Sequence, residues 1–224
     1  MAADRDGAGR GRSAVTQPGH RAGLAPPNAG RKWPPELLSP AEARRLLGQP
    51  SRRAPTGIRN RALIAVLWRG GLRVSEALAL APRDVDVAAC ALVVRHGKGD
   101  RHRTVGMDPA AFGLLERWLE ERRRLGLSRA PVFCTLQGRA LRASYVRTLL
   151  PRLARKAGID KRVHPHGLRH TCAAELAVEG VPVNLIQAQL GHASLHTTTV
   201  YLRQIAPVEL LGVMRARAWT EDQG

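Results

Sequence analysis

Apolar residues recur at helical spacing through most of the chain after residue 38. The first predicted helix begins at Ser39, where Ser39, Pro40 and Glu42 have the pattern of a capping box, and it ends at Gly48. The next, in IRNRALIAVLWRG, is apolar on nearly every side, which predicts a buried helix ended by the glycine pair that follows. The same periodicity predicts helices at 73–80, 109–125, 142–157, 167–179, 182–190 and 207–218.

Two short β-branched segments interrupt this helical pattern. Residues 92–95 and 103–105 flank the turn sequence HGKGD, an arrangement that predicts a β-hairpin. PVFC, at 131–134, is a further short apolar segment. The predicted fold class is therefore mainly α with a small antiparallel β-sheet or hairpin (α+β).

The N-terminal residues 1–32 differ from the rest, because they are rich in Gly, Ala, Arg and Pro and have no hydrophobic period. This composition predicts a disordered basic arm, with order beginning near Trp33. We therefore divide the chain into this arm, one domain at 33–206, and a C-terminal helix and tail at 207–224.

Charge narrows the possible partners. Lys and Arg number 36 against 18 Asp and Glu, so the formal net charge is +18, and the basic residues are spread along the chain. This distribution is typical of a protein that binds a phosphate-rich partner. A role in solubility alone is less favoured, because so much like charge repels itself. Aromatic residues make up only 4%, which disfavours single-strand binding by base stacking.

The cysteines and the apolar runs indicate the compartment. Cys90, Cys134 and Cys172 lie far apart and form no CxxC pair, which predicts reduced thiols in a cytosolic protein. No apolar run is long enough to span a membrane, and the N-terminus lacks the apolar region of a signal peptide. We expect a cytoplasmic protein.

Five segments place a cation, an imidazole or a phenol beside a glycine or turn signal: GGLRVSEALAL, HGKGDRHR, HPHGLRHT, LGHASLHTT and VYLRQ. In this order and spacing, from about Ser39 to Ile205, they resemble the catalytic domain of the tyrosine recombinase (phage integrase) family. The resemblance implies the fold of that domain and a DNA strand-transferase that needs no metal and no cofactor. It also implies double-stranded DNA as the partner, a homo-tetramer on DNA, and a prokaryotic protein associated with the nucleoid.

The resemblance assigns the central chemistry to three residues. Tyr201 would be the nucleophile that attacks a DNA phosphate and forms a 3′-phosphotyrosine. Arg73 and Arg169 would hold the non-bridging oxygens of that phosphate. A planar guanidinium suits this task, since it offers two parallel donors and stays charged as negative charge develops.

The remaining matched positions would handle protons or support the pocket. Lys98, in the hairpin turn, would protonate the departing 5′ oxygen. His166 and His192 would donate hydrogen bonds to the phosphate and manage protons around Tyr201, with neither assigned as the sole base. Glu76 would orient the cations, and His170 would support the same pocket from its helix.

Two features of the chain depart from the family pattern or extend it. Only about 38 residues precede the first predicted helix, so we expect a short form without the family's separate helical core-binding domain, or a remnant of the catalytic domain. The tail carries an amphipathic stretch with Val208, Leu211, Val213 and Met214. In the family such a helix docks on a neighbouring subunit, and the alternative is a helix folded back on its own core.

Two other functions remain possible from the sequence. A metal enzyme would use His164, His166, His170 and Cys172, and helical spacing places His166 and His170 on one face. Against it, the helix has no HExxH glutamate, and the interposed Arg169 would repel a cation. The second alternative is a DNA-binding relative that has lost its chemistry.

Overall fold

The computed structural model describes residues 36–95, 102–191 and 215. The chain divides into Met1–Pro34 and Pro35–Gly224, and every described residue belongs to the second unit. The arm predicted at 1–32 therefore lies outside the described residues, as does the helix predicted at 207–218 except for Arg215. The described helices are α1 (Pro40–Gly48), α2 (Pro55–Trp68), α3 (Val74–Ala79), α4 (Pro109–Arg124), α5 (Ala143–Lys156), α6 (Pro165–Val178) and α7 (Val183–Leu190), with a short 3₁₀ helix at Pro82–Asp84.

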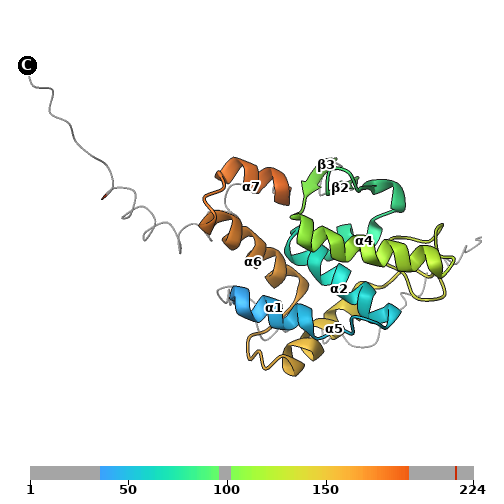
Figure 1. Ribbon diagram of the computed structural model, residues 1–224. Helices are drawn as coiled ribbons and strands as arrows, with labels where there is room; N and C mark the ends of the chain where they lie inside the picture. The colour runs from blue at the N-terminus through green and yellow to red at the C-terminus, as the bar shows by residue number, and fades with distance from the viewer. Residues whose placement is uncertain (1–35, 96–101, 192–214, 216–224) are drawn as a thin grey trace, which may run out of the picture. The chain divides into compact units, whose positions relative to one another are not determined.

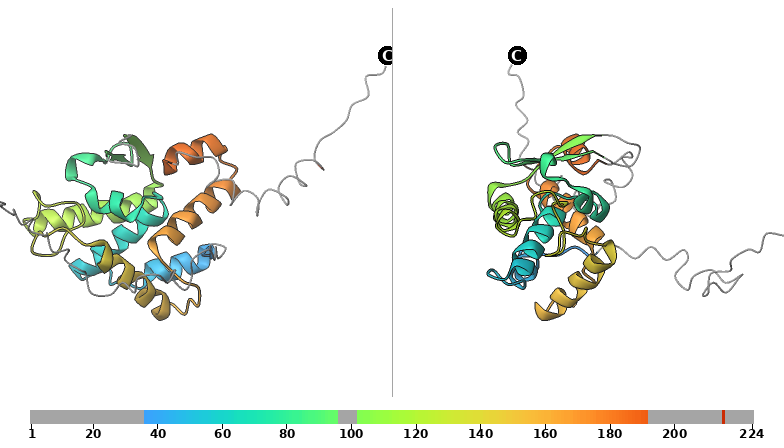
Figure 2. Two further views of the ribbon diagram at one scale, coloured as in Figure 1. Left: turned by 180° about the vertical axis from the view of Figure 1, so that it is seen from behind. Right: turned by 90° about the vertical axis from the view of Figure 1, so that its right-hand side faces the viewer.

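Helix α2 is the centre of the described core (Figure 1). It contacts α1, α3, α4 and α6, and eleven of its 14 residues are buried. This explains why its sequence is apolar on nearly every side, and it confirms the predicted buried helix. The small sheet and α7 lie at one end of the molecule, and α1 and α5 lie at the other (Figure 2).

The capping box predicted for the first helix is present. The Ser39 hydroxyl accepts a hydrogen bond from the Glu42 amide at 3.2 Å, and the Glu42 carboxylate accepts one from the Ser39 amide at 2.7 Å. Lys161 donates to the same carboxylate at 2.7 Å, so the start of α1 is also tied to the segment before α6. These bonds satisfy amide donors that a helix start otherwise leaves unpaired.

The predicted hairpin is part of a three-stranded antiparallel sheet in the order β1-β2-β3. Strands β2 (Ala91–Val94) and β3 (Arg103–Gly106) form the hairpin, and Leu92 opposite Val105 supplies its buried face. Strand β1 (Val85–Asp86) was not predicted, because two residues are too few to show an alternating pattern. The turn HGKGD lies at 96–100, outside the described residues.

The boundaries of α6 and α7 matter for the site. Helix α6 begins two residues before the prediction, because the Nδ1 atom of His164 accepts a hydrogen bond from the Gly167 amide at 3.0 Å and caps the helix. Histidine is not a usual capping residue, so the sequence did not indicate this start. Helix α7 ends at Leu190, and its capping residue Gly191 has a φ of 63°, the left-handed conformation that favours glycine.

All three cysteines are free thiols, and Cys134 and Cys172 are buried. Within the described parts of the chain, no helix is both long and apolar enough to cross a membrane.

Candidate active site

The turn between α2 and α3 brings Arg73 close to α6, the helix that carries Arg169. Gly71 has a φ of 64°, and a Cβ atom there would lie only 2.6 Å from a methyl carbon of Leu190 and 3.2 Å from the Cys172 sulfur. Only glycine allows this approach. The close contact sets Arg73, the residue before α3, beside Arg169 of α6.

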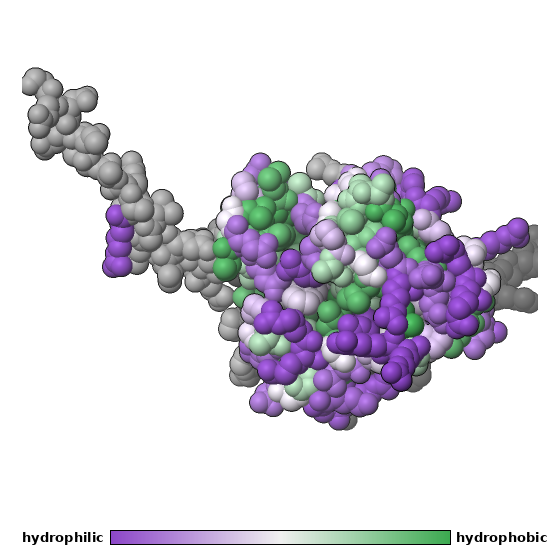
Figure 3. Space-filling view, viewed as in Figure 1, coloured by the Kyte–Doolittle hydropathy of each residue, from purple (hydrophilic) through white to green (hydrophobic). Residues whose placement is uncertain are grey.

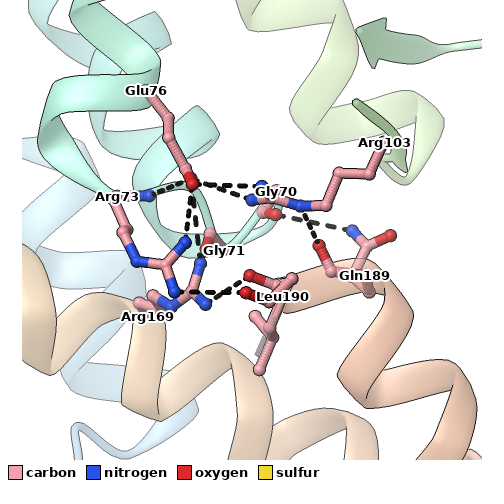
Figure 4. A network of polar contacts seen from close by, with 9 residues as sticks. Gly70, Gly71, Arg73, Glu76, Arg103, Arg169, Gln189 and Leu190 are labelled. Atoms are coloured by element: carbon pink, nitrogen blue, oxygen red, sulfur yellow. Dashed lines mark hydrogen bonds and ion pairs between the residues drawn. The ribbon is translucent and has the colours of Figure 1, made fainter. Parts of the chain in front are cut away.

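Glu76 lies at the centre of this site (Figure 4). Its carboxylate accepts hydrogen bonds from the Arg73 amide at 2.8 Å and from the Arg73 guanidinium at 2.7 Å. Arg103 of β3 donates to both carboxylate oxygens, at 3.0 and 2.8 Å, and Arg169 approaches to 3.9 Å. We call these four residues the arginine cluster. One carboxylate faces three guanidinium groups, so the cluster keeps a positive charge suited to an anion.

The protonation state of Glu76 follows from these contacts. Burial alone would raise its pKa, but the hydrogen bonds from Arg103 and from the Arg73 backbone lower the pKa to about 2. Glu76 is therefore ionised throughout the neutral range. Its role in orienting the cations stays a prediction.

The lowered pKa of Glu76 makes the stability of the fold depend on pH. A carboxylate with a folded pKa near 2 and an ordinary value of 4.5 stabilises the fold fully above pH 4.5, and this contribution is lost as pH falls towards 2. We expect Glu76→Gln to lower the free energy of unfolding by about 3 kcal/mol at pH 7. Urea denaturation of both chains across pH should show this difference shrinking below pH 4.5. A difference that is constant with pH would contradict the assignment.

Arg169 is almost completely buried, with 1% of its side chain exposed. Its guanidinium donates to the backbone oxygens of Gly71, at 2.7 Å, and of Leu190. Its Nε has no hydrogen-bond partner among the described residues. Burial and the nearby Arg73 cation lower its pKa to about 10, so it remains charged at neutral pH. A buried, charged donor without a partner is costly, and an anion would relieve that cost.

The C-terminus of α7 is attached to the same cluster. Its last carbonyl oxygens each accept from a different arginine: Gln189 from Arg103 at 3.1 Å, Leu190 from Arg169, and Gly191 from Arg73 at 3.2 Å. These carbonyls have no partner within the helix and carry its negative dipole end, so cations suit them.

The histidines of α6 lie on neighbouring turns of the helix. His166 is exposed and His170 is buried, and their ring centroids are 3.8 Å apart in an edge-on arrangement. Although His166 as a whole residue is exposed, part of its ring is shielded from water. This shielding and the cation of Arg169 lower the pKa of His166. A neutral imidazole at pH 7 can accept a proton as well as donate a hydrogen bond.

The four residues of the metal alternative do not form a metal site. The Nδ1 atom of His164 is used to cap α6. Burial raises the pKa of the Cys172 thiol to about 12, far from the thiolate that a metal requires. Across 36–95 and 102–191, no group of three potential ligands is placed to hold a metal ion.

The predicted site residues thus divide into two groups. The structure brings Arg73, Glu76 and Arg169 into one network and places His166 beside His170. The other three predicted positions lie outside the described residues: Lys98, His192 and Tyr201.

Arg103 and Gln189 also belong to the site, and the sequence did not predict them there. The missed signal for Arg103 is its position on β3. Arg103 and Val105 share one face of the strand, and Val105 is buried. An arginine on a buried face needs an acidic partner, and Glu76 supplies it.

Comparison with known proteins identifies the family of the chain. The model of the phage integrase family matches residues 36–206. The tyrosine recombinase XerC of Xanthomonas axonopodis pv. citri is 38% identical over 181 residues, which cover 80% of this chain and 57% of the relative. The tyrosine recombinase XerD of Lacticaseibacillus casei is 36% identical over 170 residues, or 75% of this chain and 58% of the relative. The chain thus spans less than two thirds of the length of these relatives.

Solved structures share the fold. The crystal structure of XerA recombinase matches with a TM-score of 0.73 and 34% identity, covering 87% of this chain and 70% of that one. The XerH site-specific recombinase, bound to a palindromic difH substrate in a post-cleavage complex, matches with a TM-score of 0.68 and 28% identity over 83% of this chain and 54% of that one.

Proposed function

The chain belongs to the phage integrase family, and from this premise we propose that it is a site-specific recombinase that cleaves and rejoins DNA strands. The Tyr201 oxygen attacks a backbone phosphorus, the bond from phosphorus to the 5′ oxygen breaks, and the strand end is held as a 3′-phosphotyrosine beside a free 5′-hydroxyl. Religation reverses these steps with the 5′-hydroxyl of another strand. No nucleotide is needed, because the phosphotyrosine bond conserves the energy for rejoining. No metal is needed either, because the arginine cluster supplies the positive charge that would stabilise the phosphate.

The observation that carries this proposal is the arginine cluster. Arg73 is 30% exposed, so its remaining donors can reach a phosphate, and beside it Arg169 is a buried cation whose Nε has no partner among the described residues. Glu76 and the backbone carbonyls hold both guanidinium groups in place before any ligand binds. Donors that are already oriented stabilise the charge that develops on the non-bridging oxygens.

Proton transfers complete the reaction. Lys98 protonates the departing 5′ oxygen, because an ammonium group carries a proton at neutral pH. His166 and His192 donate hydrogen bonds to the phosphate and handle the Tyr201 proton. The lowered pKa of His166 supports this, because its neutral ring can take up a proton.

Duplex DNA is the substrate that we propose. The net charge of +18 favours a polyanion, and XerH, a relative by structure, was solved bound to a palindromic difH substrate in a post-cleavage complex. Contacts to phosphates dominate such binding, so affinity should fall steeply with salt. The protein would then act on DNA of the prokaryotic nucleoid, in the cytoplasm.

Covalent trapping distinguishes a recombinase from a DNA-binding relative without chemistry. The full chain is incubated with a library of duplexes that carry a randomised core and a nick, so that the short cleaved end diffuses away and religation is blocked. We expect protein–DNA adducts that survive denaturation and form equally with a chelator present. Sequencing the trapped DNA gives the preferred duplex, called the trapping substrate below. Binding to the library without any adduct would favour the inactive relative.

We also propose that the chain acts as a homo-tetramer on DNA, with the tail at 207–218 docked on a neighbouring subunit. A groove of about 850 Å³ lies between α1, α2, α4 and α6, and Figure 3 shows apolar surface at the centre of this face, bordered by polar residues. Three carboxylates line it (Asp108, Glu175 and Glu179), with Arg44 and Arg69 as its cations. The tail segment PVELLGVMRARA suits this groove through its apolar residues, since Arg69 already pairs with the three carboxylates. The apolar residues that line the groove include Leu38, Leu47, Trp68, Ala111, Leu114 and Val178.

Val178 offers a test of this docking, because it lines the groove and is 64% exposed, so the fold tolerates a change there. We expect Val178→Asp to reduce assembly of tetramers on paired trapping substrates, measured by mass photometry, because a carboxylate in the groove opposes apolar docking. Val87→Asp is the matched control, since Val87 is 51% exposed and does not line the groove. A lower melting temperature with unchanged stoichiometry would instead indicate that the tail folds back on its own subunit.

A further inference from the structure

Arg103 connects three elements of the site. Its side chain is only 11% exposed, and its two terminal nitrogens donate to both oxygens of Glu76, at 3.0 and 2.8 Å. Its Nε donates to the Gln189 carbonyl oxygen at 3.1 Å. One guanidinium therefore joins β3 to α3 and to the end of α7, and it uses all three of its nitrogens to do so (Figure 4).

These bonds control how Glu76 interacts with the other two arginines. Glu76 is 2% exposed, so water cannot replace a lost partner. Arg103 accounts for two of the four short hydrogen bonds to its carboxylate, and Arg73 accounts for the other two. Without Arg103, the buried carboxylate would draw on Arg73 and on Arg169, now 3.9 Å away, to compensate for its lost partners. Those are the donors that a phosphate would use.

The end of α7 depends on the same side chain. A Cβ atom at Gly191 would lie 2.8 to 2.9 Å from three atoms of Arg103, so the glycine packs directly on the guanidinium. The side-chain amide of Gln189 also pairs with the backbone of Gly106 in β3. Its oxygen accepts from the Gly106 N–H at 3.2 Å, and its nitrogen donates to the Gly106 carbonyl oxygen at 2.7 Å. The loss of Arg103 would thus loosen the end of α7, whose carbonyl oxygens accept hydrogen bonds from Arg73 and Arg169.

We infer that Arg103 is a positioning residue for the strand cleavage proposed above. It supplies two of the four hydrogen bonds to the Glu76 carboxylate and fixes the end of α7. Arg73 then uses only one guanidinium nitrogen for Glu76, and Arg169 stays 3.9 Å from it, so both keep donors for a phosphate. This inference rests on the proposed function. Three of the five N–H groups of Arg103 are bonded within the protein and its side chain is 11% exposed, so we assign its effect to Glu76 and the end of α7 and not to a phosphate contact.

The first test separates binding from cleavage. In Arg103→Met, the affinity of the full chain for the trapping substrate should change by less than about threefold, while single-turnover cleavage at saturating protein falls by about a hundredfold, the loss expected from a small misplacement of catalytic groups. Arg103→Lys should not restore the rate, because an ammonium cannot bridge both oxygens of Glu76 and reach Gln189. Full activity in Arg103→Lys, or lost affinity with cleavage per bound complex intact, would overturn the inference.

Arg122 provides the matched control for losing a buried arginine. It is 2% exposed and donates to backbone oxygens of Leu127, Ala130 and Pro131 after the end of α4, away from the cluster. Arg122→Met should lower the melting temperature yet leave cleavage per bound complex within about twofold of the original chain. The reason is that Arg122 does not position any residue that would donate a hydrogen bond to the phosphate. An equal loss of cleavage in Arg122→Met would show that Arg103 acts only through general stability.

A double-mutant cycle tests whether Arg103 acts through Glu76. Glu76→Gln alone should slow cleavage, and the double variant should lose less than the product of the two single losses, because both changes break the same contact and only the bond of Arg103 to Gln189 is lost in addition. Fully additive losses would refute the coupling. Absence of any adduct from the unaltered chain is a different result, since it would mean that the proposed function has failed and not the role of Arg103.

Discussion

A chain with phenylalanine in place of Tyr201 should bind the trapping substrate normally and form no covalent adduct. The substitution keeps the ring and removes only the oxygen that attacks phosphorus, so binding contacts stay while the reaction has no nucleophile. Binding is measured by a filter or mobility assay, and adducts are measured after denaturation. The expected loss of adduct is complete within the detection limit.

Tyr145 is the matched control, because it is the other tyrosine of the chain. Its hydroxyl donates to Asn60 at 3.1 Å and accepts from Arg59 at 2.7 Å inside the fold. Tyr145→Phe should therefore cost about 1 kcal/mol of stability and leave adduct formation intact. Adducts that survive Tyr201→Phe but disappear in Tyr145→Phe would reverse the assignment of the nucleophile.

Arg169→Lys should slow cleavage per bound complex by about a hundredfold to a thousandfold, the usual cost of removing one oriented donor from a developing charge. Lysine keeps the positive charge but cannot donate to Gly71, to Leu190 and to a phosphate with the geometry of a planar guanidinium. Single-turnover cleavage at saturating protein measures the effect, and Arg169→Ala should lose at least as much.

The affinity measured on the same Arg169 variants decides what the residue does. Because Arg169 is 1% exposed, it adds little to the contacts with the DNA backbone that dominate affinity. Affinity should therefore change little. Reduced affinity with unchanged cleavage per bound complex would make Arg169 an ordinary phosphate contact and would remove it from the proposed reaction.

Local signals in the sequence predicted much of the fold. The capping box of Ser39 and Glu42 and the apolar content of α2 each act within one helix, and the structure has both. Strand β1 escaped prediction, because it exists only by pairing with β2. The start of α6 differed because His164 replaces a usual capping residue.

The site was predictable where its contacts are local or its spacing matches the family. Arg73 and Glu76 lie within one turn at the start of α3, so their pairing follows from the sequence. Arg169 was recognised only by its motif, since its contact with Gly71 joins distant segments. Arg103 was not placed in the site, because its bonds to Glu76 and Gln189 depend on how β3, α3 and α7 pack. Long-range packing of this kind leaves no periodic signal in one sequence.

The most direct test of the central claim is to identify the residue that becomes joined to DNA. The adduct with the trapping substrate is digested with nuclease and protease, and mass spectrometry locates the nucleotide on the peptide. We expect a 3′-phosphate linked to the oxygen of Tyr201, with a free 5′-hydroxyl on the released strand. Linkage to a serine, a histidine or any other residue, or a 5′-phosphate on the released strand, would contradict it.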